Sequence, residues 1–459
     1  MIGRQYLWVL RLERWTRMRF TPLGRMLFSG LIAVGLFSLN PRATLAYQLA
    51  ALMLAVLLGA MLWAPLFRAR VRAWRRLPRY ATAGVPFAYT LEIENGARRA
   101  LGELEAVDEP AAVTAHEAIV QARALVPAHR RWWGRRVGYM GFVRALRLLE
   151  GVHGTPISVP RLAAGERTRV RMTLTPTRRG YLRLGRLRLM RSDPLWVFRA
   201  LVRIPLADRL LVLPRRYPVS WNGSGGALRR AQRGRSRARN TGAGTDFARL
   251  REYRPRDSMR HIHWRAWARL GEPVVKEFHE DSPSRNALVF DTRAPAQCTR
   301  ETFEEAVSVA ASFVTDSGWR SGRLDVLIAA DSAVRLGQQG DAEGLNRMLE
   351  LLACVQRAAP GAPAMAPETV LARIGECEAC VLVLLDFDMR CQALVRALQR
   401  ARVATLVLVV ASDAVQLVRG GLGGVLDASC VHALVPGTAA QVLTNLHAGA
   451  PPTRHSAVA

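Results

Sequence analysis

The chain has 459 residues, of which half are hydrophobic and 22% are charged, so it can form several folded domains and is neither wholly disordered nor fibrous. Its formal net charge is +30, and all of its basic residues except Lys276 are arginines. Because Lys276 lies between Val275 and Glu277, a phosphate-binding Gly-Lys-Ser/Thr loop is excluded, and Schiff-base chemistry would have a single candidate lysine.

Residues 1–79 predict a membrane hairpin with basic flanks. Uncharged runs cover 26–39 and 44–67, and Asn40-Pro41-Arg42 between them is typical of a turn. The second run is long enough to cross a hydrocarbon core of about 30 Å, whereas the first needs snorkelling or local thinning of the bilayer. The alternative is a buried hairpin inside a soluble protein.

The arginines predict the orientation of this hairpin. Arginines crowd the sequence before residue 26 and after residue 67, and Arg42 alone lies in the connecting turn. Positive charge stays on the cytoplasmic side, so we expect two spans, both termini and the bulk of the chain in the cytoplasm, and the turn outside. The six cysteines all follow residue 297, and a stapled secreted protein would be smaller and richer in cysteine.

Residues 80–213 predict a β-rich, sandwich-like domain. Val170–Leu174 alternates between polar and apolar residues, and Gly and Pro turns separate further short runs of this kind. A basic, aromatic insertion lies near 120–153, with arginines and tryptophans at 130–136 and helical spacing at 142–149. This insertion either lies on the membrane surface or forms a solvated cover over the sheet, and both alternatives are open.

Residues 214–243 are rich in Gly, Ser and Arg and have no apolar periodicity, which predicts a flexible linker. The arginine run at 229–239 would suit contacts with nucleic-acid phosphates. No aromatic stacking platform or recognition helix accompanies it, so we prefer a solvated tether near an anionic membrane and expect no nucleic acid.

Residues 244–285 mix aromatic, basic and acidic residues without a clean period. Tyr253-Arg254-Pro255-Arg256-Asp257 predicts a tight turn, because proline fixes φ and aspartate accepts backbone hydrogen bonds. The arginines can pair with nearby acids and stack on aromatic rings. The segment is therefore either an internal network that locks one domain onto the next or a docking surface for a partner or an anion. Its candidate residues are Phe247, Leu250, Arg251, Tyr253, Pro255, Asp257, Arg260, His263, Trp264 and Arg269.

This segment resembles the signature of a bacterial family called domain of unknown function 58. The family pattern is approximately Gly-x-Glu-Phe-x-x-Leu-Arg-x-Tyr-x-Pro-Gly-Asp-x-x-Arg-x-Ile-Asp/His-Trp-Lys-x-x-Ala-Arg, and the ten candidate residues match it. Arg178-Arg179-Gly180-Tyr181 and Asp193-Pro194-Leu195 resemble two further elements of the family, and the N-terminal hairpin is typical of it. The chain departs from the pattern at Asp246, Arg256 and Arg265, where the family has Glu, Gly and Lys.

Residues 286–447 predict a doubly wound α/β domain with a parallel sheet, and residues 448–459 predict a disordered tail. The family resemblance implies a von Willebrand factor A-like fold for this domain. We expect strands at 286–291, 324–330, 381–385 and 403–410, and helices at 303–314, 345–355 and 394–398.

Carboxylates follow two of these strands, in the part of a doubly wound fold where function gathers. The von Willebrand factor A fold often holds a divalent metal with Asp-x-Ser-x-Ser, but this chain has Asp291-Thr292-Arg293-Ala294-Pro295. Both serines are absent, and Arg293 puts positive charge where a cation would sit. Asp291, Asp386 and Asp388 are therefore weak candidates for Mg²⁺, and no cofactor is expected.

The resemblance implies a membrane-anchored, non-catalytic adaptor in the bacterial inner membrane that works with a MoxR-type AAA+ ATPase on envelope or membrane proteins. The residues agree on one point, since a chain without a nucleotide loop needs another subunit for any role driven by ATP. One alternative is a metal-dependent hydrolase that uses Asp291 and Asp386. Another is an arginine-rich protein that binds nucleic acid.

Overall fold

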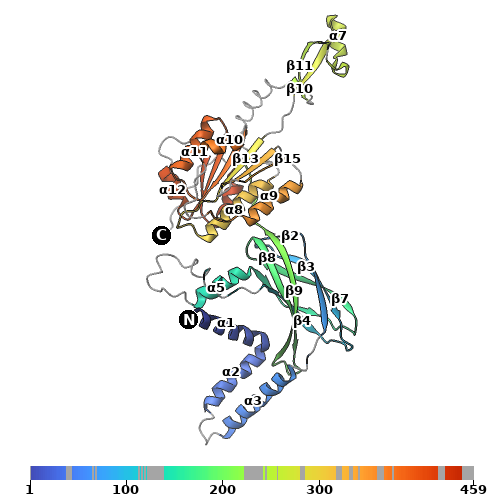
Figure 1. The fold of residues 1–459 in the computed structure, drawn as a ribbon, viewed down its shortest axis with the longest axis vertical. Coiled ribbons are helices and arrows are strands. Elements are labelled where there is room, and N and C mark those ends of the chain that lie inside the picture. Colours follow the sequence, from blue (N-terminus) through green and yellow to red (C-terminus); the bar gives the residue numbers. More distant parts are fainter. Residues whose placement is uncertain are drawn as a thin grey trace. The chain divides into compact units, whose positions relative to one another are not determined.

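The computed structural model describes residues 2–37, 44–64, 67, 70–111, 114, 117, 120, 139–221, 241–242, 246–255, 257–279, 285–316, 323–329, 334–339, 342–358, 366–374, 377–421 and 430–446. The chain divides into two compact units, Met1–Arg215 and Arg216–Ala459, which are described separately below (Figure 1).

The first unit begins with the helices α1 (Ile2–Arg19), α2 (Pro22–Phe37) and α3 (Thr44–Trp63). Residues 45–63 of α3 are long and apolar enough to cross a membrane, with a mean hydropathy of 2.1. The apolar helix α2 has 16 residues and is shorter than a full span. It also starts four residues before the predicted run, because Pro22 suits the first helical position and Thr21 caps the helix. The predicted turn at 40–42 lies outside the described residues.

In the described residues that follow α3 in this unit, nine strands form two sheets. The first sheet has the order β1 (Val71–Arg76), β3 (Phe87–Asn95), β7 (Arg167–Pro176) and β5 (Val152–Gly154). The second has the order β2 (Tyr80–Thr82), β9 (Arg199–Leu213), β8 (Gly180–Ser192), β4 (Leu104–Pro110) and β6 (Ile157–Val159). Neighbouring strands are antiparallel except for the pair β2 and β9.

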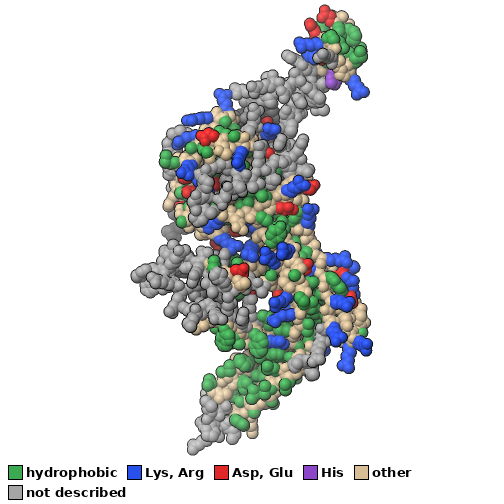
Figure 2. Space-filling model, viewed as in Figure 1, with side chains coloured by type: hydrophobic (Ala, Val, Ile, Leu, Met, Phe, Trp, Pro, Cys, Tyr) green, Lys and Arg blue, Asp and Glu red, His purple; other side chains and the backbone are tan. Residues whose placement is uncertain are grey.

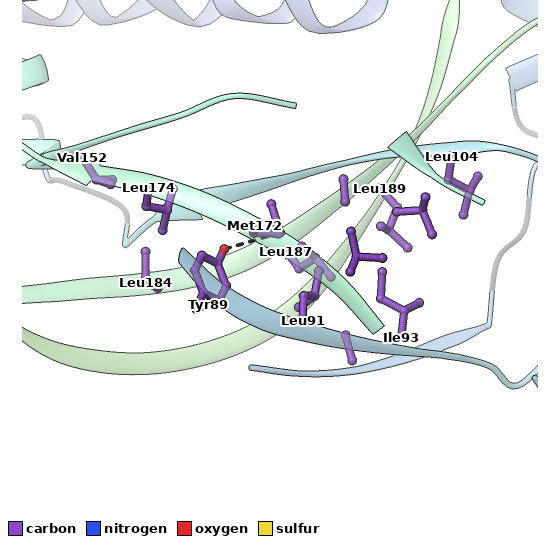
Figure 3. Packing of buried hydrophobic residues seen from close by; sticks show 14 of the residues in the cluster. Tyr89, Leu91, Ile93, Leu104, Val152, Met172, Leu174, Leu184, Leu187 and Leu189 are labelled. Atoms are coloured by element: carbon purple, nitrogen blue, oxygen red, sulfur yellow. Dashed lines mark hydrogen bonds between the residues drawn. The ribbon is translucent and has the colours of Figure 1, made fainter. Parts of the chain in front are cut away.

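Alternation along the strands builds the core between these sheets. Leu91, Met172, Leu187 and Leu189 are buried from both sheets into one hydrophobic cluster (Figure 3). The insertion near 120–153 contains the helix α5 (Tyr139–Glu150), which confirms the helical spacing predicted at 142–149. The arginines and tryptophans of 130–136 lie outside the described residues.

A buried ion-pair network joins the two sheets. Arg75 of β1 donates two hydrogen bonds to Asp108 of β4 through Nε and Nη2, and a third to Asp208 of β9 at 2.8 Å. The hydroxyl of Tyr89 on β3 also donates to Asp108. Burial and the charge of Asp108 raise the pKa of Tyr89, so this phenol stays neutral and can donate. The side chains of Arg75 and Asp108 are fully buried, so each charge depends on the other.

The turn between β8 and β9 attaches the strands to the helices. Asp193 accepts the N–H groups of Val197 and Phe198 at 2.7 and 2.9 Å, which fixes the turn. Val197 and Phe198 are buried with Leu57 and Ala60 of α3. The backbone N–H of Thr21, between α1 and α2, donates to the carbonyl of Val197 at 3.1 Å. The β8–β9 turn therefore packs against the junction between α1 and α2.

The second unit contains a six-stranded sheet with the order β15 (Val334–Gln339), β14 (Arg323–Ala329), β13 (Arg285–Asp291), β16 (Ala379–Leu384), β17 (Ala404–Val410) and β18 (Val431–Leu434). All neighbouring strands are parallel except β14 and β15. The helices in this part of the chain are α8 (Arg300–Thr315), α9 (Ala342–Cys354), α10 (Pro367–Ile374), α11 (Met389–Arg400), α12 (Ala414–Gly421) and α13 (Ala439–Thr444).

These elements confirm the four strands and three helices expected from the apolar pattern in this region. The predicted linker at 214–243 differs from the structure at both ends. At its start, Tyr217 donates to Ser312 and Glu305 of α8, and Trp221 packs edge-on against Phe313. At its end, Thr241–Gly242 form a strand, β10. Residues 222–240 lie outside the described residues.

Replacing Arg75 should open the sandwich. An Arg75→Met variant leaves the Asp108 carboxylate buried without its cation, which costs about 3–5 kcal/mol. Hydrogen-exchange mass spectrometry of the peptides from β3 and β4 should therefore show faster exchange. The control is Arg72→Met on the same strand, because Arg72 is 76% exposed and its pair with Glu94 spans 4.0 Å. Equal exchange in the two variants would contradict a structural role for the network.

Adding a methyl group at Gly24 should separate the turn from α2. A Cβ at this position would overlap the carbonyl oxygen of Val197, whereas a Cβ at Gly35 of the same helix meets no atom within 4 Å. Gly24→Ala should cost about 1–3 kcal/mol of overpacking. Gly35→Ala should be neutral or stabilising, because alanine favours the helix. Thermal melting of both variants in detergent measures the difference, and a Gly24→Ala variant as stable as Gly35→Ala would contradict the tight contact.

Candidate functional site

The signature segment folds into a small sheet with two short helices. Its strands β11 (Asp246–Glu252) and β12 (Val274–His279) pair antiparallel, and β10 (Thr241–Gly242) pairs with the other edge of β12. Between β11 and β12 the chain forms the 3-10 helix η3 (Met259–His261) and the helix α7 (Trp264–Leu270). Ile262, Val274 and Val275 are buried together, since Ile262 bridges to Val275 across the segment. The arrangement is thus a strand pair covered by a helical connection.

Arg251 and Asp257 hold the predicted tight turn in place. Nη1 and Nη2 of Arg251 donate to the two carboxylate oxygens of Asp257 at 2.7 and 2.6 Å, which is the bidentate geometry of a strong ion pair. The N–H of Arg254 also donates to this carboxylate at 2.8 Å, and the N–H of Asp257 closes the turn onto the carbonyl of Arg254. The hydrogen bonds from Arg251 and Arg254 lower the pKa of Asp257 to about 2.

His263 begins α7. Its Nδ1 accepts the N–H of Ala266 at 2.9 Å, and its own N–H donates to the carbonyl of Val274. A histidine in this position caps the helix and ties it to β12. Gly271 ends the helix in the left-handed conformation, with φ at 74°, and returns the chain to β12. Tyr253 completes the frame by donating its N–H to the carbonyl of Pro273.

The other candidate residues whose side chains are described face solvent. Trp264 is 63% exposed and stacks on Trp267, with ring centroids 5.3 Å apart. Met259 and Leu270 are also exposed. Leu250, Pro255, Arg260 and Arg269 are exposed as well, and the side chain of Phe247 lies outside the described residues. The structure therefore splits the predicted set into a fixed frame of Arg251, Tyr253, Asp257 and His263 and an exposed part. Sequence reasoning did not single out three exposed neighbours of that part, Met259, Arg265 and Leu270. We call the exposed residues Leu250, Met259, Arg260, Trp264, Arg265, Arg269 and Leu270 together the signature surface.

Asp291 lies at the carboxyl end of β13, where it is paired with a cation from its own loop. Nη2 of Arg293 lies 2.6 Å from one carboxylate oxygen of Asp291, and the N–H of Arg293 donates to the other at 3.0 Å. The hydrogen bond to Asp291 raises the pKa of Arg293 despite partial burial. Sequence reasoning placed positive charge here, and the structure shows that the guanidinium folds directly onto the carboxylate.

The other two aspartates at this sheet edge have structural hydrogen bonds. Asp388 accepts the N–H of Cys391 at 2.8 Å and caps α11, and Asp386 accepts the N–H of Phe387. Burial opposes ionisation of Asp388, but the Cys391 hydrogen bonds and the charge of Arg293 outweigh it and lower the pKa of Asp388. Within the described part of the chain, no three His, Cys, Asp or Glu side chains come together as a metal site.

Three cysteines contact the same sheet. Cys377 and Cys380 lie at the start of β16, away from the edge that carries Asp291, and Cys391 lies in α11 beside Asp388. Burial raises the pKa of Cys377 to about 11 and raises that of Cys380 as well, so both thiols remain protonated at neutral pH. Cys380 and Cys391 belong to the hydrophobic cluster that covers one side of the sheet. Protonated thiols are poor metal ligands and poor nucleophiles, because the thiolate is the reactive form.

Comparison with known families gives a match over the segment and the sheet just described. Residues 249–434 match the family described as "Protein of unknown function DUF58". This match assigns residues 249–434 to the DUF58 family. The match starts inside β11 and ends with β18, so it includes most of the signature segment and the six-stranded sheet. It does not extend to the sandwich or the helical hairpin, whereas the predicted resemblance covered nearly the whole chain.

No curated protein matches this chain. Among solved structures, it is similar to an ASH/PapD-like domain of human CEP192 with 13% identity, over 31% of this chain and 87% of that domain. The TM-score of 0.17 is too low for this likeness to carry an argument.

The depressed pKa of Asp257 gives a direct test of the Arg251 pair. A carboxyl with a lowered folded-state pKa stabilises the fold at pH values above its unfolded pKa of about 3.9, and this stabilisation is lost as the pH falls toward the folded value of about 2. A ¹³C NMR titration of the Asp257 carboxyl carbon should have its midpoint near 2. Arg251→Ala should move the midpoint up toward the ordinary value. A wild-type midpoint near the ordinary value would show that the pair does not form in solution.

Proposed function

We propose that this DUF58 protein is a membrane-anchored, non-catalytic adaptor that presents its signature surface to a partner protein. The observation that carries the proposal is that the signature segment separates side chains that hold its fold from side chains that are exposed to solvent. The polar side chains that could take part in a reaction are already used to hold the turn and the helix: Arg251 and Asp257 pair with each other, and His263 caps the helix. What remains exposed is a set of Trp, Met, Leu and Arg side chains, and Trp, Met and Arg are enriched at protein interfaces.

The six-stranded sheet supports a binding role more than a catalytic one. Its strand order changes direction between β13 and β16, and in open α/β sheets this switch point is where ligands bind. We infer a von Willebrand factor A-like fold from this order and from the family resemblance. At the switch point Asp291 is neutralised by Arg293, so the carboxylate is not available for a metal-assisted hydrolysis.

Membrane anchoring is supported by α3 and by the arginines around the hairpin. Residues 45–63 have the length and hydropathy of a span, and α2 would form the second span with help from snorkelling side chains. The arginines before α2 and after α3 favour an orientation with both termini in the cytoplasm. The bulk of the chain would then lie at the inner membrane of a bacterium.

The partner we propose is a MoxR-type AAA+ ATPase, on the strength of the resemblance to the family. An ATP-driven process needs such a subunit, because the sequence has no Gly-Lys-Ser/Thr loop. The adaptor would hold the ATPase at the membrane while it acts on envelope or membrane proteins. The arginine run at 229–239 is interpreted as a tether, and we expect no nucleic acid.

A pull-down from the native bacterium tests this proposal. From detergent-solubilised membranes, wild-type bait should recover a MoxR-type AAA+ ATPase. Trp264→Ala should reduce recovery by about tenfold or more, as expected for an aromatic hot spot. Tyr181→Ala is the matched control, because Tyr181 is an aromatic residue of the sandwich that is 58% exposed. A replicated absence of the ATPase with intact bait would overturn the proposal, and equal recovery with Trp264→Ala would remove the signature surface from it.

A further inference from the structure

Two exposed hydrophobic residues lie at the tip of the β8–β9 turn. Leu195 is 56% exposed and Trp196 is 66% exposed, although the next two residues, Val197 and Phe198, are buried. Trp196 also has a positive φ of 56°, a conformation that non-glycine residues seldom adopt. The hydrogen bonds that Asp193 accepts from Val197 and Phe198 fix the backbone of this turn. The turn therefore presents the side chains of Leu195 and Trp196 from a fixed backbone.

The position of this turn relates it to the proposed spans. Its buried half contacts Thr21, just before α2, and packs with Ala60, close to the end of α3. These are the ends of the hairpin at which the chain enters and leaves the proposed membrane region. A cationic side chain contacts aromatic rings at this end of α3. The guanidinium of Arg191 lies over the rings of Trp63 and Phe67, with its carbon 5.5 and 5.7 Å from the two ring centroids. Tryptophan and arginine both favour the boundary between lipid and water.

The helix α1 brings a second exposed apolar face to the same place. Trp8, Leu12 and Trp15 have helical spacing on one face of α1, and their exposures are 66%, 47% and 42%. Trp15 joins this face to the turn, because its ring packs edge-on against Phe20 and Phe198 at 5.9 and 6.4 Å. An arginine-rich helix with one aromatic, apolar face is typical of segments that lie in the membrane interface.

Arg19 adds charge that suits a lipid surface. Its guanidinium lies over the ring of Phe198, 5.7 Å from the centroid, at the end of α1. Burial and the nearby positive charge of Arg203 lower the pKa of Arg19, so an anionic group at this position would relieve the repulsion. Anionic headgroups of the cytoplasmic leaflet supply such a charge.

We propose that the tip of the β8–β9 turn and the exposed face of α1 form one surface that is embedded in the headgroup region of the bilayer and holds the sandwich directly against the membrane. This inference rests on the proposed membrane anchoring. The proposed surface is continuous with the apolar helices, which favours lipid as its occupant. Figure 2 shows hydrophobic side chains covering the helical hairpin, whereas arginine side chains lie over the strands of the sandwich.

Photo-crosslinking in vesicles tests the inference with the full chain. Leu195, Trp196 and Trp8 are replaced one at a time by the photoreactive residue p-benzoylphenylalanine, and the purified protein is placed in vesicles of phosphatidylethanolamine and phosphatidylglycerol. The same probe at Leu54 of α3 is the positive control for anchoring. Val85, which is 49% exposed in the β2–β3 turn near the far end of β9, is the negative control. Mass spectrometry then identifies adducts of lipid mass after illumination.

We expect the three interface probes to take up lipid about tenfold more than the Val85 probe. Lipid uptake at Leu54 without uptake at Leu195 and Trp196 would overturn the inference and leave the anchoring intact. A failure at Leu54 as well would overturn the anchoring itself. Uptake at the turn without uptake at Trp8 would remove α1 from the surface. Two probe positions in the turn protect the result against the misfolding of one variant.

Discussion

One buried carboxylate fixes the connection between the two main parts of the first unit. Asp193 accepts the backbone N–H groups of Val197 and Phe198, which fixes where the β8–β9 turn places these two residues. These two side chains are what the helices pack upon. The turn that joins the longest strands of the sandwich, β8 and β9, therefore forms the surface against which the helical hairpin packs. The same turn holds Trp196 at a positive φ of 56°, which a non-glycine residue seldom adopts.

Arginine serves as an internal cation at several places in this chain. Arg75 crosses between two sheets to Asp108, Arg251 holds a turn through Asp257, and Arg293 neutralises Asp291 at a strand end. In each case the planar guanidinium contacts both oxygens of one carboxylate or adds a second hydrogen bond nearby, which lysine cannot match. The arginine excess of the sequence is therefore partly structural, and it is not by itself a sign of an anionic ligand.

The local elements of the fold were predictable because their signals are local. Alternation in β7, the apolar runs of α3 and the tight turn at Asp257 follow from neighbouring residues in the chain. The contact of Thr21 with Trp196 and Val197 could not be found in this way, since 175 residues separate the first two partners. The Asp193-Pro194-Leu195 element attracted notice as a motif, but its role appeared only with the packing of Phe198. Likewise, the signature residues were recognised as a set, and only the structure separates those that hold the turn from those that face solvent.

The pairing of Asp291 with Arg293 has a consequence for how this domain responds to its surroundings. In a site that depends on a dissociable ion, occupancy follows the concentration of that ion and can be abolished by a chelator. Here the cation belongs to the chain itself, two residues away from the carboxylate. The positive charge opposite Asp291 is therefore in place as soon as this sheet edge has folded.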